Sequence, residues 1–590
     1  MKKQTQFFFI LILILFFYEI QLRAQNAPSI EWQKCFGGSS NDYARSIQQT
    51  IDGGLIIAGY SYSNDGDVSG NHGGADYWIV KTDEVGNTIW QKCFGGTGND
   101  YAYSIQQTTD GGFIATGVSK SNDGDVSGNH GWSDIWTLKL DSSGNITWST
   151  CSGGSYNEAA YSVRETINGD YIIAGHTNSI DGDVVVGDDN WYTNQYWIIL
   201  LDSSGNLKDQ GGGGDYTAHE LAYDIQPIGD GGYVFVGQEN TGGNYEDYFS
   251  INWIDSSLAY AWSGVGFLGE PAGAYAVALT SNNGFVIAGY ADTYYYGDAN
   301  YAILNLDSNQ NINWFAELGG SGSDIAWSVQ QTSDKGYIAA GYTGSNNGDV
   351  SGNHGGNDYW IVYLDSAGNL AWQKALGGSN NDEAFSVQQT VDNGFIIAGN
   401  ANSYDGNVSG SHGGSDYWIV KLSCYMSQAF YADSDNDGFG NVAASVITSD
   451  CSQPAGYIAD TTDCDDTNEN INPDANEILF NGIDDNCDGF IDEFGTDIYS
   501  SPNTVSDFSL FPNPTNGEFV VHLQLNNELN AEAKIEVISL LGQVVCSKAS
   551  AVLKGKLQDA IKLNDEVDGI YLVRLRVNDE AYYWQIVYQK

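Results

Sequence analysis

Two short runs of alternating acidic residues have the spacing of a calcium-binding loop. They read DSDNDG at 433–438 and DDNCDG at 484–489. In such a loop, oxygens from alternate positions converge on one ion. Neither run has glutamate at the twelfth position of an EF-hand, where Ala444 and Gly495 stand. Other residues must therefore complete the coordination, and Asp492 and Glu493 are the nearest candidates for the second loop.

The second run lies in a longer stretch, Cys464 to Glu493, that contains CDDT, INP, NGIDDNCDG and IDE. This stretch resembles the MopE-type metal-binding repeat, although Glu477 lacks the further cysteine that often follows in such repeats. The resemblance implies that the acids are metal ligands. Copper prefers nitrogen or sulfur donors, and residues 424–495 contain no histidine, so calcium is the predicted ion. The predicted ligands are Asp433, Asp435, Asp437, Asp463, Asp465, Asp466, Asp484, Asn486, Asp488, Asp492 and Glu493.

The surrounding region, residues 424–495, holds 16 acidic residues and no lysine or arginine. A compact module with this charge needs counterions, which bound metal would supply. A module of about 70 residues also has a small core and needs covalent staples. We predict the disulfides Cys424 with Cys451 and Cys464 with Cys487, as export to an oxidising compartment allows. The alternative is a solvated acidic spacer held by the same disulfides.

Acidic residues also recur at one position of a long sequence repeat, ten residues after a marker tryptophan. Acids gathered at a channel mouth would bind a cation, such as calcium, or a polyhydroxylated ligand, and would raise one another's pKa values. The alternative is that each acid holds its own turn through hydrogen bonds from the backbone. These acids are Asp42, Asp100, Glu158, Asp324 and Asp382.

A polar loop is the second feature of the repeat. It reads NDGDVSGNHGG at 64–74, and similar loops occupy 122–132, 346–356 and 404–414. Asp65, Asp67 and Asn71 have the oxygen-rich character of a calcium loop, whereas the histidine of each loop suggests zinc. Glycine-rich Asx turns explain the same residues without a ligand. The histidines are His72, His130, His354 and His412.

The repeat itself predicts the fold. Its starts lie 52 to 59 residues apart, at Trp32, Trp90, Trp148, Leu207, Trp262, Trp314 and Trp372. Each copy supplies four short strands, which predicts one blade of a β-propeller. The last copy ends after its third strand at Leu422, and the first begins with an orphan strand at residues 30–35. Pairing these two strands would close a seven-bladed ring and remove exposed sheet edges. The repeats resemble those of bacterial β-propellers in secreted surface proteins.

In this ring the recurrent acids and the histidine loops share one face, and the loops of the first, second, sixth and seventh blades form one contiguous arc. We predict recognition of a partner on that face. The repeated glutamine pairs 48–49, 106–107, 330–331 and 388–389 are expected to satisfy backbone groups between blades, and a role in reading a ligand is the alternative. Cys35, Cys93 and Cys151 occupy one slot in successive blades, too far apart for disulfides, and are expected to be packed thiols.

Both ends of the chain carry export signals. Lys2 and Lys3 precede the apolar run 7–18, which predicts a signal peptide cleaved after Ala24 or Ala27. No later segment is long and apolar enough to span a membrane. At the other end, LFPNPTNG, KIEVISLLGQVV and DGIYLVRLRV, with a terminal strand ending at Lys590, resemble the type IX secretion C-terminal sorting domain. The resemblance implies contact with the type IX machinery and passage through the periplasm to the outer cell surface or medium; an ordinary Ig-like module is the alternative.

We therefore expect an all-β chain: a signal peptide at 1–24, a seven-bladed β-propeller at 28–423, an acidic calcium module at 424–495, a linker at 496–506 and an Ig-like β-sandwich sorting domain at 507–590. The net charge of −53 disfavours nucleic acid as a partner. No catalytic signature is present, so the expected function is a non-catalytic secreted or surface protein that binds a glycan or a surface protein. The alternatives are a carbohydrate-active hydrolase or lyase that uses the recurrent acids, and a structural spacer.

Overall fold

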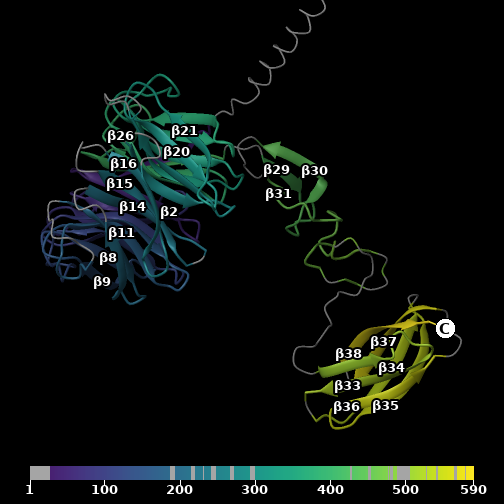
Figure 1. Cartoon of the computed structure of the whole chain (residues 1–590). Coiled ribbons are helices and arrows are strands. Elements are labelled where there is room, and N and C mark those ends of the chain that lie inside the picture. Colours follow the sequence, from purple (N-terminus) through teal and green to yellow (C-terminus); the bar gives the residue numbers. More distant parts are fainter. Residues whose placement is uncertain are drawn as a thin grey trace, which may run out of the picture. The chain divides into compact units, whose positions relative to one another are not determined.

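The computed structural model describes residues 27–589 with internal gaps. The gaps are 186–192, 214–218, 230, 241–246, 266–271, 293–298, 425–427, 449–453, 476, 479–480, 482, 488, 490–504, 527, 540–541, 564–567 and 578–579. The predicted signal peptide and most of the predicted linker fall outside the described residues. The chain forms two compact units, Met1–Ser427 with Ser449–Cys451 and Gln428–Thr448 with Ser452–Lys590. The described elements of both units are β-strands (Figure 1), and no described helix could span a membrane.

The first unit contains seven separate four-stranded antiparallel sheets, six of which consist of four consecutive strands. The first three of these six contain β2 (Asp42–Gln49), β3 (Leu55–Ser61), β4 (Asp76–Thr82) and β5 (Thr88–Phe94); β6 (Asp100–Gln107), β7 (Phe113–Ser119), β8 (Asp134–Leu140) and β9 (Ile146–Ser152); and β10 (Glu158–Glu165), β11 (Tyr171–Thr177), β12 (Gln195–Leu201) and β13 (Leu207–Gly213). The next three contain β14 (His219–Pro227), β15 (Tyr233–Asn240), β16 (Asp247–Ile254) and β17 (Tyr260–Val265); β18 (Ala272–Leu279), β19 (Phe285–Ala291), β20 (Asn300–Leu306) and β21 (Ile312–Leu318); and β22 (Asp324–Gln331), β23 (Tyr337–Thr343), β24 (Asp358–Leu364) and β25 (Leu370–Leu376).

The seventh sheet joins the two ends of the repeat array. It contains β26 (Asp382–Gln389), β27 (Phe395–Ala401) and β28 (Asp416–Leu422), and its fourth strand is β1 (Ile30–Phe36) from the start of the chain. β1 runs antiparallel to β28, with Ile30 opposite Leu422 and Phe36 opposite Tyr417. The predicted pairing of the orphan strand with the last repeat is confirmed.

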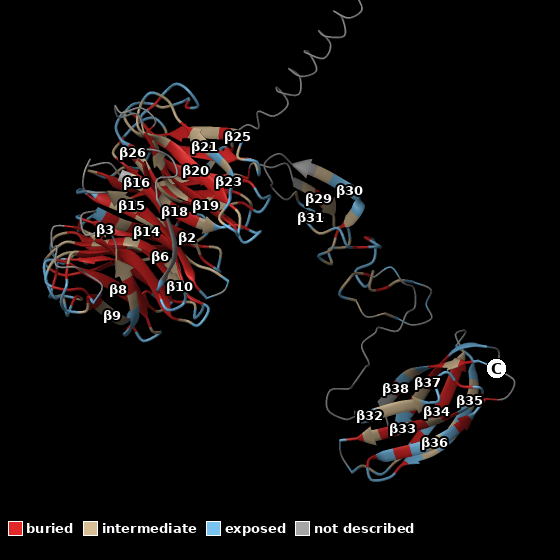
Figure 2. Ribbon diagram, in the orientation of Figure 1, coloured by how far each residue is buried: buried red, intermediate tan, exposed pale blue. Residues whose placement is uncertain are grey.

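Contacts between sheets follow one another in a cycle. The first strand of every sheet contacts the first strand of the next, and β26 contacts β2. Apolar residues fill one core between each pair of neighbouring sheets, and the core between the seventh and first sheets combines Ile57 and Trp78 with Ile419. Figure 2 shows these buried residues along the strands of the first unit. Burial between sheets explains why the second and third strands are nearly continuous apolar runs rather than alternating ones.

Buried tyrosines repeat across the same boundaries. The hydroxyl of Tyr77 on β4 donates to the carbonyl of Trp136 on β8 at 2.8 Å. Tyr301 and Tyr359 make the equivalent bond to the following sheet. Tyr417 on β28 donates to the carbonyl of Trp78 on β4 at 2.9 Å, which carries the series from the last sheet back to the first. Each of these hydroxyls thus satisfies a polar group that burial would otherwise leave unpaired.

The second unit contains the acidic module and the sorting domain. In the module, β29 (Gln428–Ala432) pairs with β30 (Asn441–Thr448) and with the short β31 (Tyr457–Ile458). In the sorting domain, one sheet contains β32 (Val505–Phe511), β33 (Glu518–Leu525) and β36 (Lys556–Lys562). The other contains β34 (Ala531–Ser539), β35 (Val544–Val552), β37 (Gly569–Val577) and β38 (Glu580–Tyr588). Apolar residues of both sheets share one core.

Candidate metal centre

The first acidic loop connects β29 to β30. Its path requires a left-handed backbone at Asn436 (φ 65°) and Gly438 (φ 97°), conformations that asparagine and glycine adopt most readily. Two side chains hold the turn from inside: Asp435 Oδ1 accepts from the amide of Asp437 at 3.3 Å, and Asp437 Oδ1 accepts from the amide of Phe439 at 2.9 Å. The second oxygen of each of these carboxylates remains available to a ligand.

A later segment brings two further acids to this loop. The amide of Asp463 donates to the carbonyl of Gly440 at 3.3 Å. Asp466 accepts from Ser434 twice, from the amide at 2.7 Å and from the hydroxyl at 2.8 Å. Asp463 and Asp466 are each only 6 % exposed. The segment after β31 is therefore fastened to the first loop by hydrogen bonds on both sides of the acids.

Five carboxylates converge as a result. Ligand atoms of Asp433, Asp435 and Asp437 lie within 4.8 Å of one another, and so do those of Asp435, Asp463 and Asp466. Asp435 belongs to both groups. Four buried oxygens in this cluster have no hydrogen-bond partner: Asp433 Oδ1, Asp435 Oδ2, Asp437 Oδ2 and Asp463 Oδ2. A buried carboxylate oxygen without a partner is costly, and a cation would satisfy all four together.

The pKa values of two clustered acids also favour a bound cation. Burial, followed by the negative charges of Asp437 and Asp466, raises the pKa of Asp435. Burial also raises the pKa of Asp463, and the charges of Asp437, Asp435 and Asp466 add to the effect. Acids that disfavour one another's ionisation in this way form a site that a cation stabilises. Because the donors are all oxygen atoms, the cluster suits a hard cation.

The structure assigns different positions to the remaining predicted ligands. Asp465 is exposed and accepts from the hydroxyl of Thr467 at 2.6 Å, so it lies outside the cluster. In the second loop, Asp484 Oδ2 accepts from the amide of Gly489 at 3.0 Å. Asp484 does not belong to the clusters of acidic, histidine and cysteine ligands found among the described residues. Asp488, Asp492 and Glu493 lie outside the described residues.

A disulfide braces the second loop. Cys464 and Cys487 are bonded, as predicted, with their Cα atoms 5.5 Å apart. Cys424 is also disulfide-bonded, and its predicted partner, Cys451, is outside the described residues. Cys464 directly follows Asp463, so the disulfide limits the movement of one metal-cluster residue. The predicted packed thiols Cys35, Cys93 and Cys151 are free and buried, and burial raises the pKa of Cys35 to about 12.

The recurrent acids of the first unit accept hydrogen bonds from the turns beside them. Asp42 is fully buried, and its carboxylate accepts from the amide of Gly38 at 2.8 Å and from the hydroxyls of Ser61 and Ser63. The other four acids accept the same bond from the glycine four residues earlier, at 2.8 to 2.9 Å. Their oxygens therefore hold turns, as the structural alternative predicts. Burial raises the pKa of Asp42 to about 6.

The polar loops fasten one sheet to the next. Asp65 Oδ1 accepts from the amide of Ser39 at 2.7 Å, and Asp67 Oδ2 accepts from the amide of Gly37 at 3.3 Å. The Nδ1 atom of His72 lies 2.6 Å from Asp76 Oδ2. Asn71 donates to the carbonyl of Ser61 at 2.9 Å. These contacts identify Asp65, Asp67 and His72 as connectors between strands and loops, and no cluster of three histidine, cysteine or acidic ligands occurs among the described residues of these loops.

One row of residues in the first unit was not predicted from the sequence. In the six sheets where this side chain is described, the first residue of the third strand carries a buried side-chain oxygen with no hydrogen-bond partner: Asp76, Asp134, Gln195, Asn300, Asp358 and Asp416. In three histidine loops the same aspartate accepts from a histidine through its other oxygen. Recurrence of an acid or amide directly before an apolar strand is the sequence signal that would have found this row.

Comparison with known families covers the C-terminal half of the second unit and part of the acidic module. The model described as "Secretion system C-terminal sorting domain" matches residues 509–589, and the MopE model described as "Putative metal-binding motif" matches residues 463–493. The chain thus carries a type IX sorting domain, which indicates export to the cell surface or the extracellular space. The metal-binding motif includes Asp463 and Asp466, two of the five clustered acids.

No curated protein matches the chain. Similar solved structures include BBS1N in a complex with ARL6DN, with 7 % identity over 68 % of this chain and 97 % of that chain and a TM-score of 0.35. An acylaminoacyl peptidase from Pyrococcus horikoshii has 7 % identity over 82 % of this chain and 57 % of its own, with a TM-score of 0.34. A gluconolactonase from Xanthomonas campestris has 8 % identity, coverages of 67 % and 95 %, and a TM-score of 0.29. At these values the similarities bear on neither fold nor function.

Proposed function

We propose that this chain is a non-catalytic binding protein of the cell surface or extracellular space. In this proposal the cycle of seven sheets is a seven-bladed β-propeller that serves as a recognition scaffold, and the acidic module is stabilised by calcium. The two-sheet sorting domain is an Ig-like sandwich that engages the type IX machinery. The signal peptide at residues 1–24 would direct the chain to the periplasm first.

The observation that carries the metal part of the proposal is the set of four buried, unpartnered carboxylate oxygens in one cluster. Calcium accepts six to eight oxygen ligands in flexible geometry, so it can use carboxylates contributed by two separate segments. Magnesium demands stricter octahedral geometry and retains its waters, and copper prefers nitrogen or sulfur donors. The cluster contains carboxylates only, which favours calcium over both.

The scaffold part rests on the cyclic contacts of the seven sheets and on the absence of a free acid–base pair among the recurrent acids. A hydrolase would need one carboxyl to donate a proton and another to act as base or nucleophile. The five recurrent acids instead accept hydrogen bonds from the turns beside them. Binding without chemistry is therefore the function that we propose for the propeller.

Isothermal titration of the full secreted chain with calcium tests the metal proposal. We expect millimolar or tighter binding and a rise in melting temperature, because a ligand that binds only the folded state stabilises it. Asp435→Asn should weaken calcium binding by at least about tenfold, since Asp435 belongs to both acid groups.

Asp465→Asn is the matched control, because Asp465 lies in the same segment as Asp463 and Asp466 but outside the cluster. It should bind calcium like the unaltered chain. No heat of binding with calcium, or equal affinities for the two variants, would contradict the proposed site. Tighter binding of copper than of calcium would contradict the choice of metal.

A further inference from the structure

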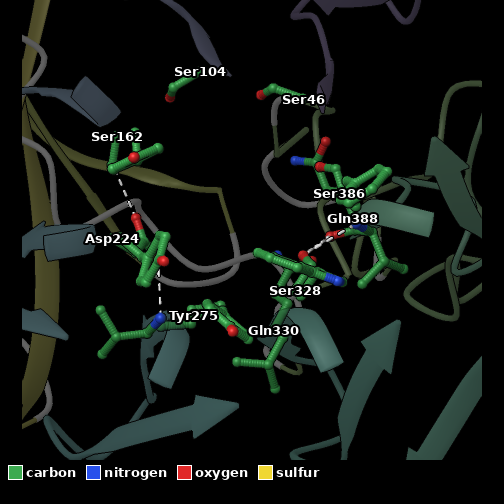
Figure 3. Close-up of a pocket in the computed structure, with 18 of the residues that line it drawn as sticks. Ser46, Ser104, Ser162, Asp224, Tyr275, Ser328, Gln330, Ser386 and Gln388 are labelled. Carbon is green, nitrogen blue, oxygen red and sulfur yellow. Dashed lines mark hydrogen bonds between the residues drawn. The ribbon is translucent and has the colours of Figure 1, made fainter. Parts of the chain in front are cut away.

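The first strands of the seven sheets surround an open cavity of about 640 Å³. Residues from all of β2, β6, β10, β14, β18, β22 and β26 line it, and Figure 3 draws 18 of these residues around the same space. The lining in β2 runs from Arg45 to Gln48, whereas Asp42 stands at the opposite end of that strand. The cavity therefore lies on the side of the turns between first and second strands, away from the recurrent acids.

Aromatic side chains form one layer of the cavity. Each first strand has a shift in register at the same position, a β-bulge that turns one side chain toward the cavity. Neighbouring rings in the layer lie 4.1 to 5.5 Å apart between centroids, and the guanidinium of Arg45 lies 4.0 Å from the ring centroid of Phe385. The layer consists of Arg45, Tyr103, Tyr161, Tyr223, Tyr275, Trp327 and Phe385.

Glutamines form a second layer, nearer the turns. The Oε1 atoms of Gln48, Gln106, Gln330 and Gln388 each accept from a backbone amide of the neighbouring sheet, at 2.6 to 2.9 Å. These bonds confirm the predicted role of the first glutamine of each pair. They also fix the orientation of the carboxamide, so that its NH2 group is the part offered to the cavity. Figure 3 shows Gln330 and Gln388 at the cavity wall.

Two arginines and one aspartate line the cavity, and two of these three charges are paired with each other. Arg164 and Asp224 stand where most repeats have glutamine and serine, and they form an ion pair at 2.8 Å. Asp224 also accepts from the hydroxyl of Ser162 at 2.7 Å and from the amide of Val277 at 3.1 Å (Figure 3). Arg45, besides its contact with Phe385, donates to the hydroxyl of Tyr60 at 3.1 Å. The cavity thus combines aromatic side chains with amide donors, and its lining carries one positive charge, that of Arg45, beyond the ion pair, within a chain of net charge −53.

We propose that this cavity binds a neutral, hydroxyl-rich sugar residue of a glycan. The C–H face of a sugar ring would stack on the aromatic layer, and its hydroxyl oxygens would accept hydrogen bonds from the glutamine NH2 groups. The volume is in the range of small-ligand sites and matches one or two sugar units. This inference deepens the proposed recognition function and moves its site from the loop-bearing face to the central cavity.

Titration of the full chain with two sets of short oligosaccharides tests the inference, one set of neutral sugars and one of uronic acids. We expect a neutral oligosaccharide to bind and its uronate counterpart to bind more weakly. Gln388→Glu should weaken binding by at least about tenfold, because the carboxylate keeps the acceptor for the amide of Gln49 but removes the NH2 donor. Trp327→Ala should weaken binding through loss of the aromatic face.

Gln389→Glu is the matched control for the donor layer. Gln389 is adjacent in sequence but does not line the cavity, and its Oε1 accepts from the amide of Ser333. Glu165 fills the equivalent position in β10 and makes the equivalent bond to Thr109, so this variant should fold and bind normally. Thermal melts of the Gln388→Glu and Gln389→Glu variants check that both retain the fold.

The outcomes separate this inference from the proposed function. Trp132 is an exposed loop residue. If oligosaccharide binding survives both Gln388→Glu and Trp327→Ala but is lost in Trp132→Ala, the binding site is on the loop face. That outcome would overturn the cavity as the binding site and retain the recognition function. Binding of neither oligosaccharide set would also overturn the inference, while calcium binding would be judged independently. Preference for uronic acids would contradict the neutral-sugar assignment.

Discussion

Asp42 shows how the protein uses a buried carboxyl as a structural acceptor. Its two oxygens receive one amide and two hydroxyl hydrogen bonds. Burial is the largest influence and raises the pKa to about 6, with a contribution from the charge of Asp416 on β28. The residue is therefore most favourable to folding when it carries a proton.

The sign of the resulting pH dependence follows from proton binding. The folded state keeps a proton on Asp42 up to about pH 6, whereas an unfolded aspartate releases it near pH 3.9. The free energy of unfolding should therefore fall as pH rises through this window, by at most about 3 kcal/mol from this residue. In Asp42→Asn this contribution is absent, so the variant's stability deficit should shrink between about pH 4 and about pH 7.

Urea unfolding of the variant and the unaltered chain across this pH range measures the deficit. Thr50→Ala, which removes a hydroxyl bonded to the exposed turn residue Asp52 instead of to a recurrent acid, is a control for general pH effects. A deficit that stays constant or grows with pH would show that Asp42 is ionised in the folded state.

Residue spacing identified three of the clustered acids, and the resemblance to the MopE-type repeat identified Asp463 and Asp466 as ligands, but neither showed that all five share one site. The alternation in 433–438 identified Asp433, Asp435 and Asp437, because a turn places alternate side chains on one side. Spacing alone does not show that Asp463 and Asp466 approach the same loop, since their positions depend on contacts with Gly440 and Ser434. The same limit applies to Arg164 and Asp224, whose pairing joins two different sheets.

At the level of elements, β1 has a role that no other fourth strand has. The other fourth strands follow their third strands through short connections, whereas β1 comes from the opposite end of the unit. Side chains reinforce its backbone pairing with β28, because Gln33 Oε1 accepts from Trp418 Nε1 at 2.5 Å. Lys421 also pairs with Glu31 at 3.1 Å. The strand thus covers an edge of β28 that would otherwise expose unpaired backbone groups.

Removal of residues 27–36 from the mature chain should lower the melting temperature and promote self-association through the exposed edge of β28. Thermal unfolding and size-exclusion chromatography measure these effects. A milder variant, Glu31→Gln, keeps the strand and removes one of the two acidic partners of the buried Lys421, which retains Asp392 at 2.7 Å, so it should change stability by less than about 1 kcal/mol. A truncated chain that stays monomeric and equally stable would contradict a structural role for β1.

The repeat spacing predicted these strands well, because each marker residue lies at or near the start of a fourth strand and the turns after it are short. The bulge in each first strand was not predicted. Its sequence signal is weak, since Arg45, Tyr103 and Trp327 occupy the bulge with different chemistry. Only the register of the neighbouring strand reveals that these residues share one direction.

At the level of the whole molecule, the sorting domain is the part whose function is best supported, because a family model covers residues 509–589. Its two sheets have their own apolar core. A domain with a separate core can be removed without taking apolar contacts from the seven sheets. This separation allows its role in export to be tested apart from binding.

A chain that ends before β32 should fold its seven sheets but fail to reach the cell surface. Cell fractionation and surface labelling of the producing bacterium measure this, and the retained protein is expected in the periplasm. The full chain with Lys554→Gln, an exposed turn residue of the sorting domain, serves as the control and should be exported. Surface display of the truncated chain would show that another segment carries the export signal.

The pairing of β1 with β28 also has a consequence for biogenesis. Glu31 and Lys421 are 390 residues apart in sequence yet belong to adjacent strands. The seventh sheet therefore cannot form until both β1 and β28 are present. In a nascent or partly transported chain that lacks β28, β1 has no strand to pair with. In an exported protein with this connectivity, the seventh sheet stays incomplete until the whole repeat region has reached one compartment.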